Sequence, residues 1–132
     1  MAGGERIEIE GLLAKSLQKP CFMFPALREK LDAPNEKGVY INYSPDDEVL
    51  HVGRTPSAKG GLGQRLRNHL AGSSSFARIY LKRNGARLRD GYKFRCLVIK
   101  NSRHRALVEA LGIVQLCLAH IGIAEKSDKL LS

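Results

Sequence analysis

Two basic side chains four residues apart, Arg65 and His69, are the pair in this 132-residue sequence best suited to chemistry. The spacing places both on one side of a helix, beside the apolar stripe of Leu62 and Leu66. A solvated arginine would take the opposite side, where Arg67 lies. An inward-leaning Arg/His pair therefore indicates an anion site, although a structural ion pair is the alternative. For His69 alone, a half-buried histidine without a catalytic role is the simpler interpretation.

Glu109 is the second residue of interest, because it lies in a mostly apolar segment. Positions 107, 111, 114, 118 and 121 form an apolar helical stripe, and the opposite side still carries Ile113 and Leu116. An unpaired buried carboxylate costs roughly several kcal/mol, so Glu109 needs a partner. The partner is a divalent cation or an arginine, and the dipole at a helix start would also favour this carboxylate.

A predicted hairpin supplies a third group, Tyr40. Runs of β-forming residues at 38–43 and 49–53 flank turn residues at 44–47. A two-residue turn at the centre of that loop pairs Tyr40 with His51. Alternation then predicts a polar face, either solvated or functional, and an apolar face. The polar face carries Tyr40, Asn42 and His51, and the apolar face carries Val39, Ile41, Tyr43, Leu50 and Val52.

The rest of the pattern predicts a small α+β domain around these groups. We expect about three strands in a mixed or antiparallel sheet flanked by helices. The further elements expected are helices at 9–17, 24–31, 62–70, 75–84 and 102–121, with Ser102 as the cap of the last, and a strand at 92–99. The main domain should span 38–123, after a helical extension at 1–37 and before a tail at 124–132.

Composition favours a folded chain with an anionic partner. Lys and Arg number 22 against 13 Asp and Glu, which gives a net charge of +9, and hydrophobic residues make up 43%. The N-terminus lacks the apolar core of a secretory signal and no run is apolar enough for a membrane span, so we expect a cytoplasmic protein. Three cysteines without framework spacing argue against a disulfide scaffold, and Cys117 with His120 lacks the second pair that a zinc finger needs.

In their order and spacing, these motifs resemble those of the GIY-YIG nucleases. The resemblance covers about residues 38 to 123. It is carried by Gly38-Val39-Tyr40, His51-Val52-Gly53-Arg54-Thr55, Arg65-Leu66-Arg67-Asn68-His69 and Glu109 within 106–111. Two departures stand out. His51 replaces the second motif tyrosine, and the asparagine that usually follows the glutamate helix is absent, with only Ser127 or Asp128 nearby.

The resemblance implies a metal-dependent endonuclease that hydrolyses phosphodiester bonds, with DNA as the first expectation. Tyr40 would accept the proton of the attacking water, assisted by His69, while Arg65 would clamp the scissile phosphate. Glu109 would hold one Mg²⁺ or Mn²⁺ ion. Substrate contacts would come from His51, Arg54, Lys82 and Arg83, in a monomer or homodimer.

Two other functions are compatible with the same residues. The first is a nucleic-acid-binding module of the same fold that has lost its chemistry through the two departures. The second is a protein-interaction domain in which the apolar helix from Ala106 docks a partner and the Arg/His pair is structural.

Overall fold

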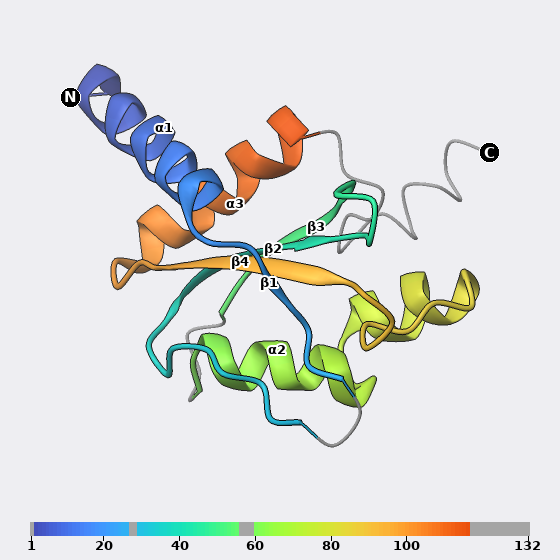
Figure 1. Cartoon of the computed structure of the whole chain (residues 1–132). Coiled ribbons are helices and arrows are strands. Elements are labelled where there is room, and N and C mark those ends of the chain that lie inside the picture. Colours follow the sequence, from blue (N-terminus) through green and yellow to red (C-terminus); the bar gives the residue numbers. More distant parts are fainter. Residues whose placement is uncertain (1, 27–28, 56–59, 117–132) are drawn as a thin grey trace.

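An antiparallel sheet with helices on both faces forms the body of the protein (Figure 1). The computed structural model describes residues 2–26, 29–55 and 60–116. The strands are β1 (Phe22–Met23), β2 (Gly38–Tyr43), β3 (Val49–Arg54) and β4 (Lys93–Val98), in the order β1-β4-β2-β3. The helices are α1 (Ala2–Gln18), α2 (Leu62–Ala71), the π-helix η1 (Phe76–Leu81) and α3 (Ser102–Leu116). The predicted α+β class is confirmed, and the short edge strand β1 is an addition to it.

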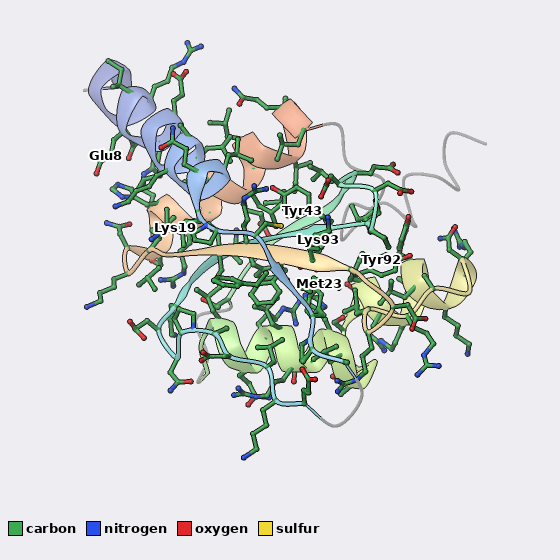
Figure 2. The ribbon with its side chains drawn as sticks, viewed as in Figure 1. Glu8, Lys19, Met23, Tyr43, Tyr92 and Lys93 are labelled. Carbon is green, nitrogen blue, oxygen red and sulfur yellow. The ribbon has the colours of Figure 1, made fainter. Side chains whose placement is uncertain are left out.

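The central strand β2 is buried along its whole length, because both faces of the sheet are covered. On one face, Val39 packs with Ile9, Leu13 and Val108 from α1 and α3. On the other face, α2 and η1 pack around Tyr40, and side chains fill the space between sheet and helices (Figure 2). The expectation of a solvated polar face is therefore wrong. The apolar stripe of α2 needs a surface to cover, and this face provides it.

The hairpin register differs from the prediction by two residues. Tyr40 pairs with Gly53 and Asn42 pairs with His51, because Ser44 closes a longer loop by donating its amide to the Glu48 carbonyl at 2.8 Å. The Ser44 hydroxyl also accepts hydrogen bonds from two amides of that loop, which fixes its length. A two-residue shift keeps Tyr40, Asn42 and His51 on one face.

Leu50 is the residue whose face was predicted wrongly. The register changes between Asn42 and Tyr43, which pair with His51 and Val49, so Leu50 is an extra residue in β3. Such a bulge redirects side chains, and Leu50 packs in the same cluster as Tyr40 instead of with Val52. The bulge thus places Leu50 beneath α2 and η1.

Helix boundaries also depart from the sequence pattern. α1 begins near the N-terminus instead of at residue 9, and the described residues of 24–31 form no helix. Asn101, and not Ser102, caps α3, since its side-chain oxygen accepts the amide of His104 at 3.0 Å. This cap moves the helix start by one residue, with Ser102 inside the first turn.

The face of α3 that meets the sheet is not the predicted stripe. Val108 and Gly112 are the buried apolar positions, and Leu107 and Leu111 pack toward α1. Val114 is 75% exposed, so the helix is not buried all round. The end of the predicted stripe lies outside the described residues. Within the described residues, no helix is long and apolar enough to cross a membrane.

Candidate functional site

Tyr40 lies at the centre of the sheet face covered by α2 and η1, and its side chain has no exposed surface. The phenol crosses over β3 at Gly53, its pairing partner. A Cβ atom at position 53 would lie 2.2 Å from the Tyr40 hydroxyl oxygen and 2.3 Å from Cζ. Glycine at position 53 is therefore what allows the phenol to point toward the neighbouring strand.

We predict that Gly53→Ala destabilises the fold by about 1–3 kcal/mol, because the added methyl group overlaps the phenol. Gly11→Ala is the matched control, since nothing lies within 4 Å of a Cβ there and the position is inside α1. That control should stabilise the protein by about 0.5–1 kcal/mol. Urea unfolding of both variants measures the difference, and equal effects would contradict this steric role of Gly53.

Arg65 contacts the Tyr40 hydroxyl from α2. Its Nε donates a hydrogen bond to Tyr40 Oη at 3.2 Å, and its side chain is half-buried, whereas Arg67 on the other side of the helix is exposed. The start of α2 is fixed by two backbone bonds, from Leu62 N to Glu36 O at 2.9 Å and from Gly63 N to Pro34 O at 2.8 Å. The loop that leads into β2 thus anchors the helix that carries Arg65.

Glu109 reaches the same region from α3. Its Oε1 accepts a hydrogen bond from Arg54 Nη1 at 3.1 Å, and the two side chains are 26% and 43% exposed. Burial raises the pKa of the Glu109 carboxyl, while the charges of Arg54 and Arg65 act to lower it. The predicted arginine partner is therefore present.

The electrostatics link Tyr40, Arg65 and Glu109 into one group. Burial raises the pKa of the Tyr40 phenol, the charge and hydrogen bond of Arg65 oppose that shift, and the charge of Glu109 adds to it. The charge of Arg65 on α2 thus acts on the pKa of both Tyr40 on β2 and Glu109 on α3. Side chains from three separate elements therefore form one electrostatic group around the Tyr40 hydroxyl.

Two histidines pack against Tyr40 in an aromatic cluster with Phe76. The rings of Tyr40 and His69 meet edge-on with centroids 5.1 Å apart, and His51 stacks on Phe76 at 4.9 Å with a 14° interplanar angle. Both histidines are buried, at 6% exposure for His51 and 1% for His69. His69 is thus more deeply buried than the half-buried histidine that the sequence suggested.

One ring nitrogen of His51 lies near the Tyr40 hydroxyl. His51 Nε2 lies 3.5 Å from Tyr40 Oη, whereas His69 Nδ1 is hydrogen-bonded to Ser74 Oγ at 2.5 Å. Arg65 can only donate to the phenol oxygen, so the phenol proton points elsewhere, and His51 Nε2 can accept it in the tautomer that carries its proton on Nδ1. Sequence reasoning had given the supporting role to His69.

The remaining predicted substrate contacts divide between two places. Arg54 lies in the site but is paired with Glu109. Lys82 and Arg83 are exposed and directly follow η1. Ser74 was missed because it lies in a run of small residues typical of a loop, and it proves to be the hydrogen-bond partner of His69. The aromatic residue Phe76, which directly follows that run, was the feature of the sequence that could have indicated a packed segment there.

The side chains around Glu109 decide which kind of divalent-cation site could form there. No group of three or more His, Cys, Asp or Glu side chains suited to a metal occurs among the described residues. Glu109 is a single half-buried carboxylate with cationic neighbours. A single carboxylate fits an ion such as Mg²⁺, which takes one or two carboxylates and completes its coordination shell with waters and phosphate oxygens. It does not fit a site in which protein side chains supply all the ligands.

Comparisons with family models and with curated proteins give no match for this chain.

Proposed function

We propose that this protein is an endonuclease that hydrolyses phosphodiester bonds in DNA, with Tyr40, Arg65 and Glu109 as its reacting centre. One observation carries the proposal: Arg65 donates to Tyr40 across 25 residues of sequence, and both share an electrostatic field with Glu109. These are three of the four catalytic residues that the resemblance to the GIY-YIG nucleases implies, and His69 is the fourth. Phosphodiester hydrolysis needs a proton acceptor, a phosphate clamp and a metal ligand within reach of one phosphate, and these contacts support that arrangement.

Arg65 is the phosphate clamp. Its guanidinium is permanently charged, and its half-buried side chain lies against the hydroxyl of a phenol that has no exposed surface. When a phosphodiester binds, Arg65 turns from Tyr40 to the phosphoryl oxygens and uncovers the hydroxyl. In-line attack by water then builds negative charge on those oxygens, which the guanidinium stabilises. Arg54, 43% exposed, supports the same phosphate.

Tyr40 and His51 handle the proton of the attacking water. As the water oxygen bonds to phosphorus and the bond to the leaving oxygen breaks, the water proton passes to Tyr40 Oη. The proton of the phenol passes to His51 Nε2, 3.5 Å away in the resting protein. A phenol alone is a poor base for this task because its proton is held too tightly at neutral pH, and burial holds it more tightly still.

Glu109 is the residue that would hold one Mg²⁺ or Mn²⁺, which when bound stabilises negative charge on the phosphoryl oxygens. The residue's own contribution is a carboxylate kept beside Arg54 and Arg65 by the docking of α3.

The experiment that tests the proposal is the nicking of supercoiled plasmid by the purified protein in Mg²⁺ or Mn²⁺, with a chelator as the negative control. Nicking that stops on chelation is the expected result. Folded protein that binds DNA but never nicks it in either ion would refute the enzyme assignment. The burial of Tyr40 and the raised pKa of its phenol favour a non-catalytic DNA-binding module as the second candidate.

We predict that His51→Gln lowers the nicking rate at least about tenfold and removes the acid limb due to histidine from the pH–rate profile. Glutamine accepts a hydrogen bond but takes up no proton, whereas histidine can do both. The limb due to Glu109 should remain, at a pH above the usual range for glutamate because its pKa is raised. His104→Gln, at the α1–α3 contact near Glu8, is the control and should leave the profile unchanged. An unaltered pH–rate profile in His51→Gln would show that His51 does not take up the proton of the Tyr40 phenol.

A further inference from the structure

A groove of about 450 Å³ runs between the C-terminal half of α2, η1 and the segment at 86–89. We propose that this groove binds the phosphodiester backbone of nucleic acid at phosphates other than the one that is cut. The inference extends the proposed function, because it assigns a second contact to the same substrate. The residues that carry it are Arg78, Lys82, Arg87, Arg89 and His69.

The charge of the groove is of one sign. Four cationic residues line it and no carboxylate does. Arg78, Lys82 and Arg87 are exposed and make no ion pair in the part of the chain that the structure describes. Cations gathered without counter-charge repel one another, so the arrangement favours an anionic ligand. Arg89 is held in place by Nη1 hydrogen bonds to the carbonyls of Pro25 at 3.0 Å and Ala26 at 2.9 Å.

Two of these cations lie four residues apart on η1, a spacing that places side chains next to one another on a helix. The segment is π-helical, and the amide of Lys82 bonds to the carbonyl of Ala77, five residues back. Residues four apart stay neighbours in it, since the rings of Phe76 and Tyr80 stack with centroids 5.5 Å apart and an interplanar angle of 8°. Arg78 and Lys82 have the same spacing and face the groove, while the aromatic pair faces the core.

His69 connects the groove to the reacting centre. Its ring lines the groove and also meets Tyr40 edge-on. Arg65 lies one turn earlier on α2, about 6 Å along the helix axis. A nucleic-acid strand held at Arg65 would therefore run along α2 past His69 to Arg78 and Lys82 of the η1 segment.

The chemistry of the groove favours nucleic acid over a membrane or an acidic protein. Three of the four cations are arginines, whose forked guanidinium matches the oxygens of a phosphate. A membrane surface also needs apolar anchors. The large exposed apolar residues of the described chain, Ile7, Phe22, Met23 and Val114, belong to α1, β1 and α3 and do not line the groove.

The test compares two triple variants of equal charge. The groove variant is Arg78→Gln, Lys82→Gln and Arg87→Gln, and the control variant is Arg6→Gln, Lys15→Gln and Lys100→Gln, all exposed positions outside the groove. Affinity for a fluorescent DNA duplex is measured by anisotropy over a range of salt, without divalent metal. The groove variant should lose at least about tenfold in affinity, and its salt slope should fall by about 2–3, since each lost phosphate contact removes about 0.9.

The outcomes separate this inference from the nuclease proposal. Equal losses of DNA affinity in the two variants would overturn the inference. It would also be overturned if the groove variant lost as much affinity for phosphatidylserine vesicles or polyglutamate as for DNA, because the groove would then be a general anion-binding surface. Because binding is measured without metal, a selective loss supports the groove even if the wild type never nicks plasmid. Thermal melting of both variants checks that each is folded.

Discussion

Arg65→Ala is expected to lower the rate of plasmid nicking by about 100- to 1,000-fold, the usual cost of removing one donor that stabilises transition-state charge. Arg65 donates a hydrogen bond to the Tyr40 hydroxyl, and its side chain is exposed enough to reach a phosphate. Its loss removes the clamp and also leaves the buried phenol without its donor. The second effect alone costs stability of about 1–3 kcal/mol, so melting is measured alongside nicking.

Arg67→Ala is the control for Arg65→Ala, because Arg67 is on the same helix, carries the same charge and faces solvent. It should change nicking little. Arg65→Lys keeps the charge but not the planar fork, so it should recover only part of the rate while restoring the fold. Equal rates in Arg65→Ala and Arg67→Ala would show that Arg65 does not touch the reacting phosphate.

Glu109→Gln is expected to reduce metal-dependent nicking by about 100-fold or more, because a bound ion stabilises the transition state by roughly several kcal/mol. Glutamine preserves the shape of the side chain and can still accept the bond from Arg54, so α3 should stay docked. Glu10→Gln is the matched control, since Glu10 pairs with Arg6 on a helix surface far from Tyr40 in sequence. Equal chelator-sensitive rates in both variants would rule out Glu109 as the metal ligand.

The stability of Glu109→Gln should change in the opposite direction from its activity. The folded-state pKa of Glu109 is raised, so its ionised form is less favourable in the folded than in the unfolded chain. That cost is fully present above the folded-state pKa and vanishes below the unfolded value, near about pH 4. The variant should therefore melt higher than wild type at pH 7, and the gap should close at about pH 3. A lower melting temperature at pH 7 would mean that the Arg54 pair outweighs the cost of burial.

The predicted chemistry relied on spacings that local structure preserves. Arg65 and His69 lie one helical turn apart whatever the helix packs against, and α2 begins and nearly ends where the stripe of Leu62 and Leu66 indicates. Tyr40 and His51 share a face because a register error of two residues preserves side-chain alternation. Such features follow from periodicity alone.

What the sequence did not reveal depends on contacts between distant segments. Part of the apolar cover over the Tyr40 face comes from η1, whose Phe76 stacks on His51, and no local pattern indicates that this segment winds as a π-helix. The Leu50 bulge depends on hydrogen bonds inside the Ser44–Glu48 loop. The pairing of Arg54 with Glu109 joins residues 55 apart, and only the docking of α3 on β3 brings them together.

The winding of η1 has a consequence for how this chain is compared with others. A π-turn holds one residue more than an α-turn, so it is equivalent to a single insertion in an ordinary helix. Deleting one residue within 76–81 would let the segment wind as an ordinary α-helix, without rotating the residues after it relative to those before it. Arg78 and Lys82 would then lie three or four residues apart, and both spacings keep two side chains on one side of an α-helix. A one-residue gap at this place in an alignment would thus mark chains that lack the π-turn, and it would not mark chains that lack the groove.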